Sequence, residues 1–137
     1  MKTLLSARAA AGALLVIITL TLLFHGLVIS GVIPFQIVWG GRISSREQLL
    51  VFEAVSVGLN LLMLAAVAAR AGLLRVRVPA GLLTAALWLM AALFALNTVG
   101  NLLSNNELEK LVFTPLTLLL ALLSLRLALA PPAAARA

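Results

Sequence analysis

Residues 9–33 read AAAGALLVIITLTLLFHGLVISGVI, an apolar run in which His25 is the only ionisable side chain. A helix that crosses the hydrocarbon core of a bilayer needs about 20 mostly apolar residues. Three further runs of this kind follow, at 49–69, 79–103 and 111–130. None of them alternates between apolar and polar residues, so helices are favoured over strands. The sequence therefore predicts an all-α membrane protein, an antiparallel bundle of four transmembrane helices.

The composition of the chain excludes a soluble protein. Hydrophobic residues make up 64% of the 137 residues and charged residues 10%, against about 45–50% and about 25% in soluble domains. Cys is absent and His occurs once, so no metal site is expected within one protomer, and no other cofactor is indicated. The net charge of +6 comes from basic residues beside the apolar runs. Nucleic acid is therefore not an expected partner. The length predicts a single domain, residues 1–137.

The basic residues predict the orientation of the chain. Short connections make neighbouring helices antiparallel, which places loops 34–48 and 104–110 at one end and loop 70–78 at the other. Seven of the ten basic residues lie at the end that holds loop 70–78 and both termini: Lys2, Arg8, Arg70, Arg75, Arg77, Arg126 and Arg136. Basic loops stay cytoplasmic, so we expect both termini in the cytoplasm. Arg70, Arg75 and Arg77 form a candidate contact for anionic lipid as well.

The first apolar run has a second interpretation, as a cleaved signal peptide, because Lys2 and Arg8 resemble its charged start. The apolar part of a signal peptide has only about 7–15 residues. The run at 9–33 is longer and reaches Pro34 without a small-residue cleavage pattern. A retained transmembrane helix is therefore the favoured interpretation.

Polar side chains inside the spans gather in the half predicted to be outermost. From the helical rise of about 1.5 Å per residue, Glu53 lies about 6 Å and His25 roughly 13 Å below the outer edge. An ionisable residue in a span costs about 2.5–3.5 kcal/mol by insertion scales, so it normally has a partner or a task. Glu53 and Asn60 share one helix face, and so do Asn97 and Asn101 on the third span.

We expect these polar faces to form a pocket that opens to the outside beneath loop 34–48. The candidate ligand-binding or proton-carrying residues are Glu53, His25, Asn60, Asn97, Asn101, Arg42 and Trp39. Structural roles stay open for each of them. Glu53 could pair with Arg42 or Arg46, and His25 could bond to Asn97 or to a backbone carbonyl. The asparagines could serve only as hydrogen-bonded contacts between helices.

Four short motifs stand out along the chain: Ile37-Val38-Trp39-Gly40-Gly41-Arg42, Phe52-Glu53, Asn97-x-x-Gly100-Asn101 and Phe113-Thr114-Pro115-Leu116-Thr117. Together they resemble a family of uncharacterised, small four-helix proteins of the bacterial inner membrane. The resemblance covers most of the chain and implies a multi-pass protein of the inner (plasma) membrane, without an activity. A looser similarity to four-helix DoxX-like proteins rests on length and number of spans alone.

Four functions remain open on the sequence alone. The favoured one is a binding or accessory module, whose pocket holds a lipid, an isoprenoid-like molecule or a helix of a partner membrane protein. A proton-coupled small-molecule transporter would carry protons on Glu53, and would act as a homodimer because four helices are few for a pathway. An enzyme is not expected, since Glu53 and His25 differ by roughly 7 Å in depth. The fourth function is a purely structural membrane subunit. No catalytic residue is assigned.

Overall fold

The computed structural model describes residues 5–132, which fold into four long helices and contain no strand. The helices are α1 (Ala7–Ile29), α2 (Arg46–Arg70), α3 (Ala80–Leu102) and α4 (Thr114–Ala128), and a π-helical turn, η3 (Glu109–Phe113), precedes α4. Each is long and apolar enough to cross a membrane, α4 together with η3. The predicted class, an all-α protein with four membrane-spanning helices, is confirmed. Lys2 and Arg136 lie outside the described residues.

Local sequence explains where the helices begin and end. The Ser45 side chain accepts a hydrogen bond from the backbone N–H of Gln48 and so caps the start of α2. The first helix ends at Ile29, four residues before the predicted boundary, because the chain turns at Gly31 with a φ of 83°. The connection that follows contains two short 3₁₀ helices, η1 (Phe35–Ile37) and η2 (Trp39–Gly41).

Pro115 lies in the first turn of α4, directly after η3. Proline has no backbone N–H, so the carbonyl of Leu111 lacks the donor that a regular helix would supply four residues later. The turn before the proline is wound as a π-helix, a form that occurs mostly as single turns within α-helices. The fourth span therefore consists of two parts, Glu109–Phe113 and Thr114–Ala128.

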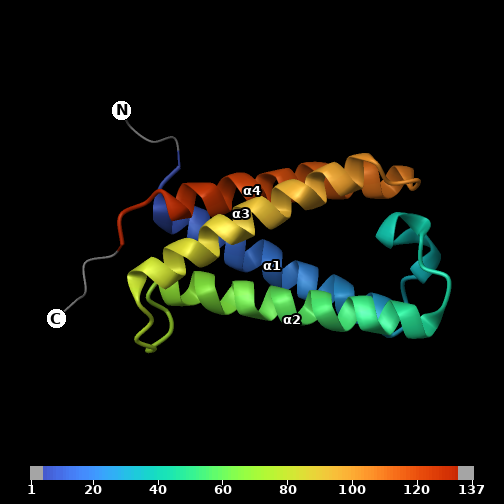
Figure 1. Cartoon of the computed structure of the whole chain (residues 1–137), viewed down its shortest axis with the longest axis horizontal. Coiled ribbons are helices and arrows are strands. Elements are labelled where there is room, and N and C mark those ends of the chain that lie inside the picture. The colour runs from blue at the N-terminus through green and yellow to red at the C-terminus, as the bar shows by residue number, and fades with distance from the viewer. Residues whose placement is uncertain (1–4, 133–137) are drawn as a thin grey trace.

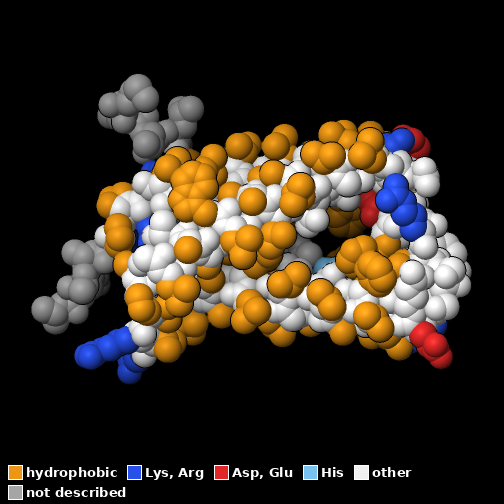
Figure 2. All heavy atoms as spheres, viewed as in Figure 1, with side chains coloured by type: hydrophobic (Ala, Val, Ile, Leu, Met, Phe, Trp, Pro, Cys, Tyr) orange, Lys and Arg blue, Asp and Glu red, His pale blue; other side chains and the backbone are white. Residues whose placement is uncertain are grey.

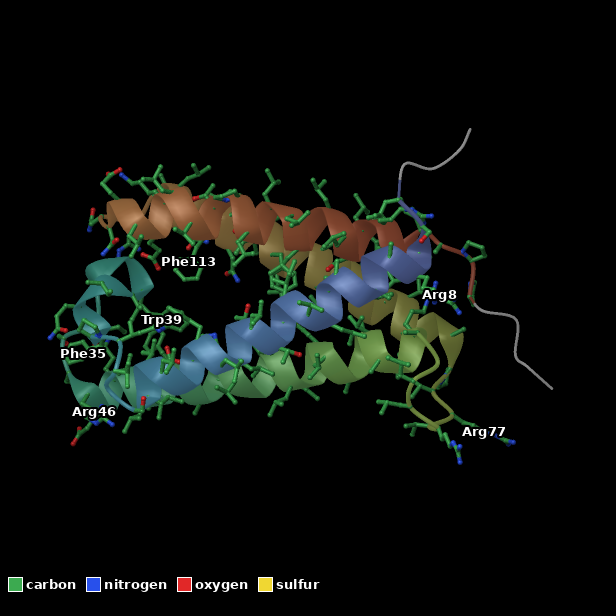
Figure 3. All side chains as sticks on the ribbon, turned by 180° about the vertical axis from the view of Figure 1, so that it is seen from behind. Arg8, Phe35, Trp39, Arg46, Arg77 and Phe113 are labelled. Carbon is green, nitrogen blue, oxygen red and sulfur yellow. The ribbon has the colours of Figure 1, made fainter. Side chains whose placement is uncertain are left out.

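The four helices form two hairpins, α1 with α2 and α3 with α4 (Figure 1). We call the end with η1, η2 and η3 the loop end, and the end with the start of α1 and the end of α4 the terminal end. The hairpins contact each other at the terminal end and diverge toward the loop end, where α3 lies beside α4 and away from α2 (Figures 1 and 3). Of the neighbouring pairs, α2 and α3 have the least contact.

The core is divided in the same way. The larger cluster joins all four helices in the terminal half, and includes Leu14, Val67, Leu87 and Leu127. A smaller cluster at the loop end joins Val28 of α1 and Leu49 of α2 to the connection between them. Continuous packing between the hairpins thus stops midway along the bundle, and the loop end is held by other interactions.

The outer surface is apolar along the length of the helices (Figure 2). Large side chains on every helix point outward, such as Leu23, Leu62, Leu96 and Leu122. Charged side chains gather at the two ends of the molecule (Figure 2). A soluble protein rarely exposes apolar patches larger than a few hundred Å². This surface fits a bilayer, in which lipid chains cover the outward-facing residues.

The position of a leucine on α1 should decide what its truncation costs. Leu14 is fully buried between the helices, whereas Leu20 is 58% exposed on the same helix. Leu14→Ala should lower the free energy of unfolding by about 2 kcal/mol or more, because it leaves a cavity. Leu20→Ala should change it by less than about 0.5 kcal/mol. Thermal unfolding of both variants in one detergent measures this, and equal losses would contradict the assigned packing.

Candidate ligand-binding site

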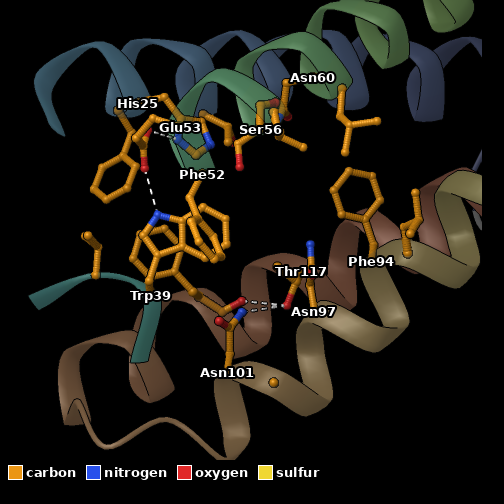
Figure 4. A pocket seen from close by; sticks show the side chains of 18 of the residues that line it. His25, Trp39, Phe52, Glu53, Ser56, Asn60, Phe94, Asn97, Asn101 and Thr117 are labelled. Carbon is orange, nitrogen blue, oxygen red and sulfur yellow. Dashed lines mark hydrogen bonds and ion pairs between the residues drawn. The ribbon is translucent and has the colours of Figure 1, made fainter. Parts of the chain in front are cut away.

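A buried carboxylate at the loop end binds two side chains from different segments. Glu53 of α2 is 1% exposed. Its Oε2 lies 2.6 Å from Nδ1 of His25 on α1, and its Oε1 accepts a hydrogen bond of 2.8 Å from Nε1 of Trp39 (Figure 4). A charged group in a span needs such partners, since lipid offers none. The three residues therefore connect α1, α2 and the loop between them.

The contact between His25 and Glu53 corrects the depth estimate from the sequence. That estimate counted from Pro34 and separated the two residues by roughly 7 Å. Since α1 ends at Ile29, His25 lies one turn from the end of its helix, at a depth similar to that of Glu53. His25 bonds to Glu53, and the expected bond to Asn97 or to a backbone carbonyl is not present among the described residues.

Glu53 does not pair with an arginine in the described structure. Arg46 donates to the backbone carbonyl of Ile29 at 2.8 Å, at the end of α1. Arg42 is exposed, and its side chain makes no hydrogen bond to any described residue. It lies at the edge of the site. Neither of the two arginine pairs considered for Glu53 is therefore formed, and the histidine and the tryptophan take their place.

The Trp39 backbone is strained to reach Glu53. Its φ is 55°, and Gly40 and Gly41 follow with φ of 68° and 69°. Glycine adopts this region freely, whereas a bulky residue there costs on the order of 1–3 kcal/mol. The hydrogen bond to Glu53 and an edge-on contact with Phe52, at 5.1 Å between ring centroids, hold the indole inside the bundle. Strain of this kind is typical of functional sites.

A second carboxylate fastens the loop to the other hairpin. Oε2 of Glu109 accepts hydrogen bonds from the backbone N–H of Gly40 at 2.7 Å and from the Ser104 hydroxyl at 2.5 Å. The backbone N–H of Glu109 is itself bound by the Asn106 side chain at 3.1 Å. Glu53 and Glu109 thus hold the Trp39–Gly41 turn between the diverging hairpins.

A cavity of about 650 Å³ lies beneath this turn. All seven candidate residues named from the sequence line it, and Glu109, Thr117 and several phenylalanines do so too. The cavity opens sideways between α2 and α3, where Figure 2 shows a hollow with the His side chain inside. That the cavity also opens to the outside beneath loop 34–48 stays a prediction. That the lining residues bind a ligand stays a prediction.

The asparagines occupy different parts of the cavity wall. Asn101 Nδ2 donates to Thr117 Oγ1 at 3.3 Å and so joins α3 to α4. Asn60 Nδ2 donates to the Ser56 carbonyl of its own helix, and its buried Oδ1 has no partner among the described residues. Asn97 projects into the cavity (Figure 4). One of the three therefore links two helices, Asn97 points into the cavity, and Asn60 keeps a buried oxygen without a partner among the described residues.

The sequence did not single out Glu109 as a site residue. Glu109 lies in the connection predicted to be a loop. It is 69 positions after Gly40 in the sequence, and only the fold brings the two residues into contact. The one available signal was the pair of glycines, since a backbone N–H without a neighbouring side chain is open to a carboxylate. Phe24 and Phe113, whose ring centroids are 5.1 Å apart, were also missed, because only the fold brings these distant positions together.

The three arginines named as a candidate lipid contact differ in their exposure. Arg70 is nine-tenths buried at the end of α2, while Arg75 and Arg77 are exposed in the connection to α3. Arg77 lies at the tip of this connection, away from Arg8 (Figure 3). That the three arginines contact anionic lipid stays a prediction.

The fold and the surface together define an integral membrane protein of the four-helix class, with a laterally open cavity at one end. No family model, curated protein or solved structure matches the chain. The resemblance drawn from the short motifs therefore stays a prediction, and the site has to be interpreted from its own geometry.

Removal of the Glu53 carboxylate should destabilise the loop end. Glu53→Leu should lower the free energy of unfolding by about 1–3 kcal/mol, because the His25 and Trp39 donors lose their acceptor. Glu53→Gln should cost less, because an amide oxygen still accepts one of the two bonds. Thermal unfolding in one detergent measures both.

Glu47→Leu provides the control, because Glu47 is exposed in the first turn of α2. In a double-mutant cycle, His25→Ala combined with Glu53→Leu should cost less than the sum of the two single changes. Additive losses, or an equal loss for Glu47→Leu, would show that the buried contact contributes nothing.

Proposed function

We propose that the protein is a small membrane-embedded binding module that takes an amphipathic, lipid-like ligand into the cavity between its hairpins. The observation that carries the proposal is the cavity of about 650 Å³ with a polar loop end and a lateral opening. Ligand cavities usually measure about 300–1,000 Å³ and combine an apolar wall with a few polar groups. Isoprenoid-like lipids belong to the same ligand class.

The polarity of the cavity changes along the bundle axis. His25, Trp39 and Glu53 lie near the loop end, and Met63 and Leu120 lie deeper in the bundle. From Glu53 to Met63 the helical rise gives about 15 Å. A lipid in the adjacent leaflet has the same polarity, with its head group near the membrane surface and its chain toward the middle. Such a ligand can enter between α2 and α3 without turning over.

The head group would meet three kinds of polar atom. The Nδ1 atom of His25 is engaged by Glu53, which leaves Nε2 to contact a ligand. Asn97 presents an amide, which both donates and accepts hydrogen bonds. Arg42 at the edge has no acidic partner among the described residues. These groups suit a hydrogen-bonding head group that carries an anionic part near the surface.

The charges support the orientation proposed for this module. The terminal end holds Arg8, Arg70, Arg75, Arg77 and Arg126, and no acidic residue is described there. Basic segments stay on the cytoplasmic side. We therefore place the loop end on the outer side of an inner membrane. In this orientation the cavity receives its ligand from the outer leaflet.

A glycine on the cavity wall allows the cavity to be filled without removing a polar group. Gly100 lines the cavity, and a Cβ at this position would meet nothing within 4 Å. Gly58 has the same free space but does not line the cavity. Gly100→Leu should abolish ligand binding, and Gly58→Leu should preserve it. Both proteins should fold, because a Cβ at either position meets no neighbouring atom within 4 Å.

Trp39 provides the optical measurement. The chain has two tryptophans, so Trp88→Phe leaves Trp39 as the sole emitter. In this background, phospholipid with brominated chains should quench the fluorescence of Trp39. The quenching should be weaker with Gly100→Leu and unchanged with Gly58→Leu. Native mass spectrometry from mild detergent should show a discrete adduct that Gly100→Leu removes. A wild-type protein without an adduct and with unquenched Trp39 would overturn the proposal.

The contact between His25 and Glu53 supports a second candidate, a proton-coupled transporter that acts as a dimer. Two ionisable side chains 2.6 Å apart inside a span are typical of proton relays. Asn60 and its unpartnered Oδ1 extend the polar path toward the middle of the bundle. The larger core in the terminal half interrupts this path, which favours the binding module.

Proton flux distinguishes the two candidates. In liposomes, a binding module should not dissipate an imposed pH gradient, with or without small-molecule substrates. A transporter should do so with wild-type protein and not with Glu53→Gln. Dye-monitored internal pH is the measurement. Substrate-dependent flux that Glu53→Gln abolishes would replace the binding module with the transporter.

A further inference from the structure

A buried arginine, Arg70, lies at the terminal end of the bundle, opposite the cavity at the loop end. Arg70 is 9% exposed. Its guanidinium donates to the Ala130 carbonyl at 2.5 Å, to the Leu127 carbonyl at 3.4 Å and to the Thr84 hydroxyl at 3.2 Å. All three acceptors are uncharged. Breaking or omitting the partner of a buried charge is strongly unfavourable.

The chain supplies no carboxylate to this end among its described residues. Its four acidic residues are Glu47, Glu53, Glu107 and Glu109, all at the loop end. Glu53 lies 17 positions before Arg70 on the same helix, which is about 25 Å. The carbonyls at the end of α4 offer a partial negative charge of about half a unit. They compensate the guanidinium only in part.

A second arginine faces the same space. Arg8 of α1 and Arg70 both line a cavity of about 390 Å³ between the start of α1 and the ends of α2 and α4. Arg8 is exposed, and its side chain makes no hydrogen bond to any described residue. The rest of the wall is small or apolar, and includes Gly12, Leu15 and Leu73.

We propose that Arg8 and Arg70 form a binding site for the phosphate group of an anionic lipid in the leaflet at the terminal end. Arginine presents paired donors that match phosphate oxygens. The phosphate would complete the compensation of Arg70, and the apolar wall would contact the start of the acyl chains. This site is separate from the proposed ligand cavity, and it joins Arg70 to Arg8 instead of to its sequence neighbours Arg75 and Arg77.

Two pairs of variants test the site without removing Arg70, whose bonds hold the end of α4. Arg8→Gln removes one charge at the cavity, and Arg75→Gln removes the same charge from the exposed connection. Gly12→Leu fills the cavity, where a Cβ would meet nothing within 4 Å. Gly81→Leu adds the same side chain in free space outside the cavity. The probe is phosphatidylglycerol, titrated into purified full-length protein and counted by native mass spectrometry, with phosphatidylcholine for comparison.

Wild-type protein should retain phosphatidylglycerol in preference to phosphatidylcholine. Arg8→Gln should weaken binding about tenfold, the size expected for a lost hydrogen bond to a charged group. Gly12→Leu should weaken it at least as much, while Arg75→Gln and Gly81→Leu should stay within about twofold, as for sites away from the ligand. Glu53→Gln should leave this binding unchanged, so that the two sites can fail independently.

Three results would overturn the proposal. The first is an equal loss of phosphatidylglycerol binding in Arg8→Gln and Arg75→Gln, which would indicate a diffuse basic surface. The second is unchanged binding by Gly12→Leu, and the third is equal retention of the two lipids by the wild-type protein. A competition with inorganic phosphate identifies the source of the phosphate group. Lipid that phosphate does not displace assigns the site to a lipid, and binding of phosphate alone, lost in Arg8→Gln, assigns it to a soluble phosphate compound.

Discussion

The hydrogen bonds of the Glu53 carboxylate govern the arrangement of the loop end. A carboxylate inside a span must find its partners within the protein, because lipid supplies neither water nor counter-ions. His25 and Trp39 satisfy both of its oxygens. To deliver its indole, the connection between α1 and α2 folds back into the bundle and holds Trp39 at a φ of 55°. A single buried group thereby holds the loop against α1 and α2 and fixes the turn that covers the cavity.

The bundle is divided between a packed half and a hollow half. In the terminal half, small residues such as Ala10 and Ala11 allow the helices to approach closely, and leucines fill the space between them. In membranes, such packing takes over the role that the hydrophobic effect has in water. At the loop end, polar contacts replace it: the Thr98 and Thr117 hydroxyls lie 3.0 Å apart, and Glu109 bonds to Gly40. The bonds of Glu53 and Glu109 hold the Trp39–Gly41 turn between the diverging hairpins, where the cavity lies.

The charges follow the same division. All four acidic residues lie at the loop end, and three of them contact a nearby polar group there: Glu53 contacts His25, Glu107 contacts Lys110 and Glu109 contacts Gly40. The terminal end has arginines and backbone carbonyls instead. A bilayer separates these two sets, so they cannot neutralise each other. The charges at each end are therefore compensated locally, by the buried contact of Glu53 with His25 at the loop end and by backbone carbonyls at the terminal end.

The sequence by itself determined the helical class, the number of spans and the set of polar residues around the cavity, because apolar length and the cost of intramembrane charge act locally. It could not decide the partners. The expected pairs of Glu53 with Arg42 or Arg46 gave way to His25 and Trp39, because a change of four residues at the end of α1 shifts a side chain by about 6 Å. Glu109 and the lateral opening were out of reach for a related reason. Both depend on how the two hairpins diverge, which is set by contacts between residues far apart in the chain.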